Sequence, residues 1–69
     1  MKPTIESLIK QSSKLLRVYG FERPRHESVI ILKDILKKKY VDILSNSDVK
    51  ISIKEKNKIL ENLFQRLKG

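Results

Sequence analysis

The sequence contains no cysteine, and this absence removes several classes of chemistry. Without thiols the chain has no disulfide, no thiolate metal site and no thiol nucleophile. His26 is the only histidine, and one imidazole does not make a metal site of three or four ligands. We therefore expect a chain that binds no metal ion and has no covalent cross-link.

Glycine and long apolar runs are also scarce. The only glycines are Gly20 and Gly69, so no glycine-rich loop is present to hold a nucleotide or nucleoside cofactor. No apolar run approaches the roughly 20 residues of a membrane-spanning helix, and Met1-Lys2-Pro3 does not lead into a signal-peptide core. The sequence predicts a cytoplasmic protein that does not bind a membrane.

Acidic side chains are few, and none is arranged for catalysis. Asp and Glu are scattered at helical surface spacing, and Asp34 with Lys38 predicts an exposed one-turn ion pair. His26 stands beside Arg25 and Glu27 without the pocket and the base or acid partner that a catalytic histidine needs, so we interpret it as surface packing. We expect no catalysis by this chain alone.

Basic residues, by contrast, are abundant: 16 Lys and Arg stand against 8 Asp and Glu, for a net charge of +8. Such an excess points to nucleic acid or to an acidic protein surface as partner. One alternative is a free-standing module that binds RNA or DNA with steep salt dependence. The sequence lacks the stacking aromatics and the base-reading helix that such a module uses, so we do not favour this interpretation. Its contacts would be Lys37, Lys38, Lys39, Lys54 and Lys58. Another alternative is an adaptor that binds a helix of a partner protein, which requires a large exposed apolar groove.

The apolar residues recur at helical spacing throughout the chain. A length of 69 residues allows one domain, and helices are expected over residues 4–19, 24–37, 39–44 and 52–67. The sequence thus predicts an all-α, four- to five-helix bundle that forms a single domain over residues 1–69 and is a monomer. The three longer helices are expected to pack through Ile5, Leu8, Ile9, Leu15, Leu16 and Tyr19, through Ser28, Val29, Ile31, Leu32, Ile35 and Leu36, and through Ile53, Ile59, Leu60, Leu63, Phe64 and Leu67.

The first corner is marked by a helix stop directly followed by a helix start. Gly20 can adopt the left-handed conformation that ends a helix, and Phe21 can then fold back on Leu16. Pro24 suits the first turn of the next helix, where its missing amide proton is not needed. These signals predict a tight connection between the first two helices.

The conspicuous hydroxyl side chains have structural interpretations. Thr4 is expected to cap the first helix, and Ser52 with Glu55 forms a capping box for the last one. Ser12 lies on the apolar stripe of the first helix and has no accompanying base, so we interpret it as a small packing residue and not as a nucleophile.

The start of the second helix carries a family resemblance. Pro24-Arg25-His26-Glu27-Ser28-Val29-Ile30-Ile31-Leu32 resembles the Pro-Arg-x-acidic-small-x-x-aliphatic-Leu pattern near the start of peptide-chain release factor glutamine methyltransferases, the HemK/PrmC family. The short apolar segment 40–44, Asp48 in a linker and a last helix that closes on Arg66-Leu67-Lys68-Gly69 agree with this order. Two positions depart from the pattern: Gln65 replaces a usual arginine, and Arg23 replaces a common serine N-cap, which predicts a weaker helix start.

The resemblance implies that this chain is the N-terminal helical domain of a longer enzyme. In that family a Rossmann-like domain follows, binds S-adenosylmethionine and carries an Asn-Pro-Pro-Tyr motif, and both are absent here. We therefore expect an excised, non-catalytic domain without a cofactor of its own. The resemblance further implies that it helps to hold a class I release factor, so that the Gln of its Gly-Gly-Gln loop reaches the catalytic domain. The candidate contacts are Arg17, Arg23, Arg25 and His26 around the first corner, because arginine forks on a rigid turn suit partner binding.

Overall fold

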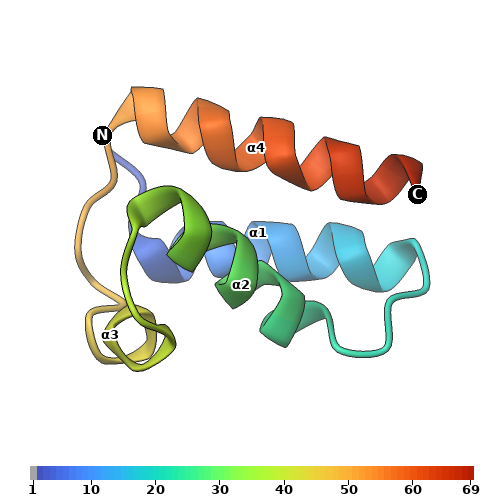
Figure 1. Ribbon diagram of the computed structural model, residues 1–69, viewed down its shortest axis with the longest axis horizontal. Coiled ribbons are helices and arrows are strands. Elements are labelled where there is room, and N and C mark those ends of the chain that lie inside the picture. Colours follow the sequence, from blue (N-terminus) through green and yellow to red (C-terminus); the bar gives the residue numbers. More distant parts are fainter. Residues whose placement is uncertain (1) are drawn as a thin grey trace.

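The computed structural model describes residues 2–69, and this part of the chain forms four helices without a strand (Figure 1). They are α1 (Ile5–Val18), α2 (Pro24–Leu36), α3 (Tyr40–Ser45) and α4 (Ile53–Lys68). Each helix begins and ends within one residue of the expected position, and the all-α prediction is confirmed. The Cα radius of gyration is 11.0 Å, which is the size expected of a compact chain of this length.

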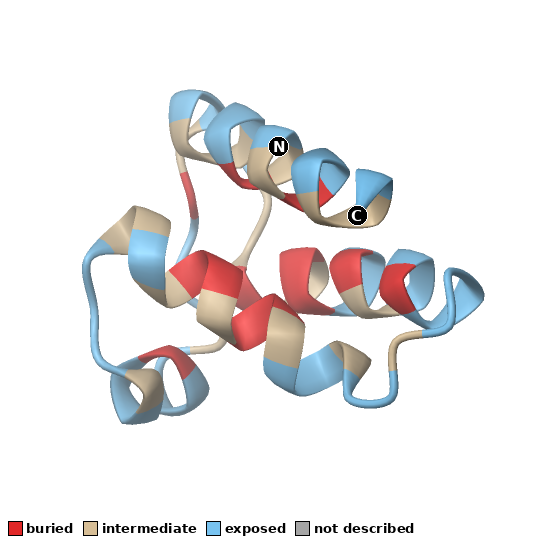
Figure 2. Cartoon of the chain, turned by 45° about the vertical axis from the view of Figure 1, so that its right-hand side comes forward, coloured by how far each residue is buried: buried red, intermediate tan, exposed pale blue. Residues whose placement is uncertain are grey.

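Helix α2 occupies the centre of the domain. It packs against α1, α3 and α4, whereas α1 and α4 also touch each other. In Figure 2 the buried residues lie on the faces that these helices turn toward one another. The run Val29 to Leu32 places apolar side chains around most of the circumference of α2, and this is why one helix can serve three neighbours.

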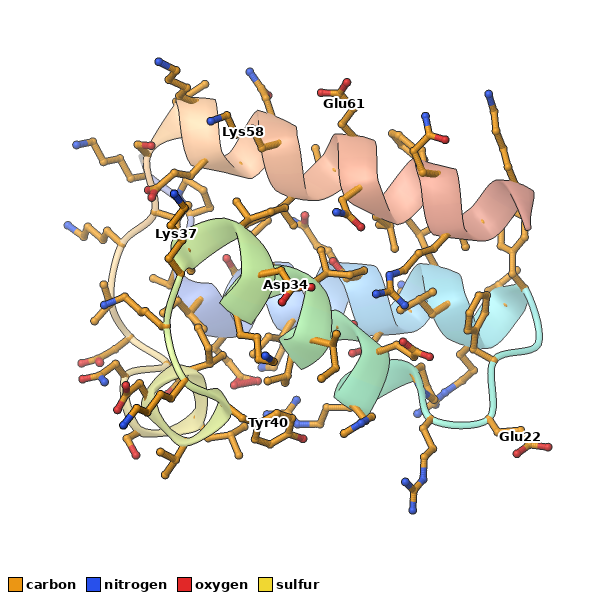
Figure 3. The ribbon with its side chains drawn as sticks, in the orientation of Figure 1. Glu22, Asp34, Lys37, Tyr40, Lys58 and Glu61 are labelled. Atoms are coloured by element: carbon orange, nitrogen blue, oxygen red, sulfur yellow. The ribbon has the colours of Figure 1, made fainter. Side chains whose placement is uncertain are left out.

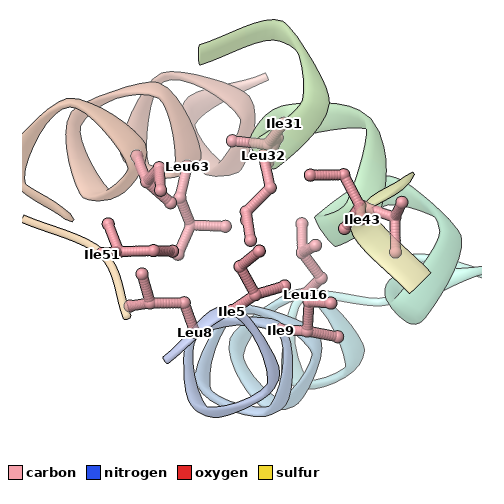
Figure 4. Close-up of a cluster of buried hydrophobic side chains, with 11 residues drawn as sticks. Ile5, Leu8, Ile9, Leu16, Ile31, Leu32, Ile43, Ile51 and Leu63 are labelled. Atoms are coloured by element: carbon pink, nitrogen blue, oxygen red, sulfur yellow. The ribbon is translucent and has the colours of Figure 1, made fainter. Parts of the chain in front are cut away.

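A single hydrophobic core joins the helices (Figure 4). Ile43 brings α3 into it, and Ile51 brings in the linker before α4. Each such buried side chain contributes roughly 1.5 to 3 kcal/mol to folding. The buried apolar residues are Ile5, Leu8, Ile9, Leu16, Val29, Ile31, Leu32, Ile43, Ile51, Ile59 and Leu63.

Four residues that were expected on the packed faces lie outside the core. Leu15 is 37% exposed, Tyr19 60%, Ile53 55% and Phe64 54%. The prediction was wrong for these positions because consecutive helical residues differ by about 100°, so a stripe cannot bury every apolar neighbour. In α1 the core line passes through Leu16 and leaves Leu15 at its edge.

The corner between α1 and α2 has the predicted geometry. Gly20 has a φ of 88°, and its N–H donates to the Arg17 carbonyl at 3.0 Å. The N–H of Phe21 donates to the Leu16 carbonyl at 3.0 Å, and the Phe21 ring packs against the core. These two bonds form a Schellman motif, which satisfies carbonyls at the end of α1.

The predicted N-caps are present in the two outer helices. Thr4 Oγ1 accepts from the Ser7 N–H at 3.1 Å, and Ser7 Oγ accepts from the Thr4 N–H at 3.0 Å. At α4, Ser52 Oγ accepts from the Glu55 N–H at 3.1 Å, and the Glu55 carboxylate accepts in return from Ser52. Both are reciprocal capping boxes.

The linker after α3 runs along the start of α1, a contact that the sequence did not predict. The Ile5 N–H donates to the Val49 carbonyl at 3.0 Å, and the Glu6 N–H donates to the Ser47 carbonyl at 2.8 Å. These amides have no partner inside α1 because they belong to its first turn. The linker therefore completes the cap of α1, and it buries Ile51 on the way to α4.

The expected ion pair between Asp34 and Lys38 at the end of α2 does not form. Asp34 contacts the neighbouring Lys33, whose Nζ lies 3.7 Å from its carboxylate, and not Lys38. The reason is Lys37, which has a φ of 55° and so ends the helix in a left-handed turn. Lys38 therefore leaves the helix before it can lie one turn beyond Asp34.

The first prediction concerns Ser12, which is fully buried and whose Oγ has no hydrogen-bond partner within the described residues. We expect Ser12→Ala to raise the free energy of unfolding by about 1 kcal/mol, because it removes an unpaired hydroxyl and adds helix propensity. Chemical denaturation measures this change. As a control, Ser28→Ala should lower it, because Ser28 Oγ donates to the Pro24 carbonyl at 2.8 Å. Destabilisation by Ser12→Ala would contradict the interpretation of Ser12 as a buried residue with an unpaired hydroxyl.

The second prediction concerns Arg23, the N-cap of α2, which makes no side-chain capping bond. Arg23→Ser should raise the free energy of unfolding by about 1 kcal/mol, because a serine hydroxyl can accept from a free first-turn amide. Thermal and urea unfolding provide the measurement. Ser52→Ala, which removes an existing cap, is the matched control with the opposite sign. Equal stability of Arg23→Ser and the natural chain would show that the backbone at the start of α2 does not place a serine hydroxyl where it can cap the helix.

Candidate functional site

A hollow between α1 and α2 gathers basic side chains. Its volume is about 410 Å³, and its lining residues are Lys10, Ser13, Lys14, Arg17, Pro24 and Arg25. We call it the basic hollow. Lys10, Lys14 and Arg17 project from one face of α1 because they are spaced by four and three residues. Arg25 reaches the same place from the first turn of α2.

The charges in the basic hollow are only partly balanced. Arg25 Nη2 lies 3.1 Å from the Glu6 carboxylate, and the two side chains are 57% and 31% exposed. Within residues 2–69, Lys10, Lys14 and Arg17 make no ion pair. Neighbouring like charges repel one another, and a partner with negative charge relieves this repulsion. The hollow is thus suited to acidic groups.

Two hydroxyl side chains, Ser13 and Ser28, contact each other beside the basic hollow. Ser13 Oγ donates to the Ile9 carbonyl at 2.6 Å and lies 3.1 Å from Ser28 Oγ, which itself donates to the Pro24 carbonyl. These small side chains let α1 and α2 approach closely. Because their hydroxyls are already engaged, they fix the shape of the hollow and do not serve as nucleophiles.

The structure divides the four predicted contact residues. Arg17 and Arg25 line the basic hollow together, whereas Arg23 is exposed at the start of α2 and is not part of the lining. His26 turns toward α3: its Nδ1 lies 3.2 Å from Tyr40 Oη, and the ring centroids are 5.4 Å apart. Tyr40 is labelled in Figure 3. The surface-packing interpretation of His26 is confirmed.

Sequence reasoning missed Lys10 and Lys14, although their spacing with Arg17 was a usable signal. They occupy the exposed side of α1, where isolated lysines are common and carry little information. What brings them into one site is the approach of α2, and only the fold reveals it.

Sequence reasoning also missed an ion pair between helices: Arg66 Nη1 lies 2.7 Å from the Glu27 carboxylate and connects α4 to α2. The acidic position of the Pro-Arg-x-acidic pattern thus has a role in packing.

The lysines of the nucleic-acid alternative lie at the other end of α2 and on α4. Residues 37–39, Lys54 and Lys58 are all exposed, and Figure 3 labels Lys37, Lys58 and Glu61. Lys58 lines a hollow of about 310 Å³ that also contains Ile35 and Glu61. The Glu61 carboxylate places negative charge inside this hollow, which makes it less favourable to a phosphate backbone.

Residues 2–69 contain no group of three or more His, Cys, Asp or Glu side chains that could hold a metal ion. In the same part of the chain, none of the helices combines the length and the apolar character that crossing a bilayer requires.

A family model described as the PrmC N-terminal domain covers residues 7–69 and thus all four helices apart from the first two residues of α1. No curated protein and no solved structure matches the sequence. Because the family model covers nearly the whole sequence, including the corner and the start of α2, the chain belongs to the PrmC N-terminal domain family.

Proposed function

We propose that this chain is the substrate-recognition domain of an S-adenosylmethionine-dependent protein glutamine methyltransferase. The proposed substrate is the Gly-Gly-Gln glutamine of a class I peptide-chain release factor, modified in the cytoplasm. The observation that carries the proposal is the family match over residues 7–69. In this proposal the methyltransferase domain follows in the parent chain, binds the cofactor and performs the reaction, while the helical domain itself is monomeric and non-catalytic.

The architecture supports a role in holding a partner. The residues of the basic hollow project from two long helices that pack directly on each other, and not from free loops. A rigid helix backbone loses little freedom when a partner binds, so the contacts that its side chains make can orient a large substrate. Orientation of this kind lowers the entropic part of a reaction barrier without any chemistry in the domain that supplies it.

The proposed contacts follow the geometry of the hollow. Arg17 and Arg25 present planar forks that can each take a carboxylate through two hydrogen bonds, and Lys10 and Lys14 add charge beside them. Arg23, exposed at the same corner, extends this surface. His26 is expected to contribute less than the arginines, because its ring already contacts Tyr40. The partner surface that fits is acidic.

The net charge of +8 keeps the nucleic-acid module as a second candidate. It would rest on residues 37–39, Lys54 and Lys58. Single-stranded nucleic acid is usually held by aromatic rings that stack on bases. Tyr40, the aromatic residue next to this lysine run, is instead packed against His26. This contact is the structural reason for placing the nucleic-acid candidate second.

The third prediction tests the basic hollow in the full-length enzyme. Lys14→Glu together with Arg17→Glu should weaken the affinity for the release factor at least tenfold, or about 1.4 kcal/mol, because two favourable charges become repulsive. Calorimetric titration gives the affinity, and methylation of a short Gly-Gly-Gln peptide checks that the catalytic domain is intact. The charge-matched control is Lys38→Glu with Lys39→Glu, which should leave the affinity unchanged. Equal weakening by both pairs would show that only net charge matters.

The fourth prediction separates the two candidate functions with single-stranded RNA. If the domain recognises a protein, its RNA binding is only the weak, non-specific attraction of a basic surface, with a Kd no tighter than about 10⁻⁶ M at physiological salt. Replacing either lysine pair, 10 and 14 or 38 and 39, with alanine should then weaken it equally. Fluorescence anisotropy at several salt concentrations measures this. Tight binding that only the 38 and 39 replacement abolishes would establish the nucleic-acid module.

A further inference from the structure

A third hollow lies where α4 ends beside the end of α1, and it is mostly apolar. Its volume is about 360 Å³, and its lining residues are Tyr19, Phe64, Leu67 and Lys68. We call it the apolar hollow. Tyr19 is 60% exposed and Phe64 54%, and Leu15, one turn before Tyr19 on the same face of α1, is 37% exposed.

The rings of Tyr19 and Phe64 would contribute to binding if a partner surface buried them. Tyr19 and Phe64 are among the large apolar side chains that the core leaves exposed, and each is more than half exposed. Burying such a ring contributes roughly 1.5 to 3 kcal/mol. Packing that leaves two aromatic rings exposed around one hollow is typical of a contact site for another apolar surface.

The C-terminal end of α4 lies at the rim of the apolar hollow. Lys68 lines the hollow, and Gly69 ends the helix with a φ of 105°, its N–H donating to the Arg66 carbonyl at 3.1 Å. A glycine in this conformation turns the chain off the helix axis. In Figure 1 this end of α4 lies next to the end of α1. A continuing chain therefore starts beside Tyr19 and Phe64.

The small size of the apolar hollow and the net charge of the chain favour an occupant that belongs to the same chain. Stable association of separate proteins uses about 20 to 30 residues a side, and four residues line this hollow. Two copies would each bring a net charge of +8, so a symmetric pair is opposed by repulsion. A segment of the same chain is different, because a short connection holds it at an effective concentration on the order of millimolar. A small apolar contact is then sufficient.

We infer that the apolar hollow seats an apolar side chain of the domain that follows in the parent chain, and that this contact fixes the angle between the two domains. The inference rests on the proposed function in one respect, which is that a methyltransferase domain follows. The contact would hold the recognition surface at a defined position relative to the catalytic domain. Lys68 at the rim favours an acidic residue next to the seated apolar side chain.

The fifth prediction is tested in the full-length protein with Tyr19→Ser and Phe64→Ser combined. Limited proteolysis should cut the connection after Gly69 at least fivefold faster than in the natural chain, and the distance distribution between fluorophores on the two domains should broaden. The matched control is Val41→Ser with Leu44→Ser, which changes two apolar residues on α3 that are 61% and 45% exposed. The control should cut at the natural rate. Circular dichroism confirms that both variants remain helical.

The outcomes separate this inference from the proposed function. Unchanged cleavage and unchanged distances in the Tyr19 and Phe64 variant would overturn the contact, even if the enzyme binds its release factor normally. A natural protein that sediments as a dimer and becomes a monomer in this variant would assign the hollow to a second copy and also overturn it. A protein whose connection is protected by Tyr19 and Phe64 but which binds no release factor would retain the contact and refute the proposed function.

Discussion

The structure depends on one constraint, which is that α2 must be covered on three sides. Val29, Ile31 and Leu32 are fully buried and point in different directions around the helix. A single partner helix can cover only one face, so α1, α3 and α4 are all needed. The surface features follow from this arrangement. The basic hollow lies between α1 and α2. The apolar hollow lies between the C-terminal ends of α1 and α4.

Local signals predicted the helices, and non-local contacts decided what the sequence could not. The capping pair Ser52 and Glu55, like the Gly20 corner, acts within a few residues and can be recognised without the fold. The bonds from the first turn of α1 to the linker at Val49 join segments more than 40 residues apart, and no local pattern encodes them. Leu15 and Leu16 show a finer limit: both are apolar neighbours, and only the packing of α2 determines that Leu16 is buried.

The candidate site was predictable to the extent that it lies at the corner. Arg17 and Arg25 are brought together because the Gly20 turn reverses the chain between them. The partial pairing of Arg25 could not be foreseen, because Glu6 reaches it from the far end of α1. Lys10 and Lys14 escaped notice for the same reason, since a lysine on an exposed face gains significance only from what packs beside it.

The last turn of α1 connects the two hollows. Arg17 lines the basic hollow and Tyr19 lines the apolar hollow, and residues two apart on a helix point in nearly opposite directions, about 200° apart. A domain seated against Tyr19 would therefore stand on the opposite side of the same helical turn from a partner bound at Arg17. The turn is held by the Schellman bonds at Gly20 and Phe21 and by the burial of Leu16. In the proposed enzyme, this turn would face the release factor on one side and the following domain on the other, and would so help to set the position of the substrate.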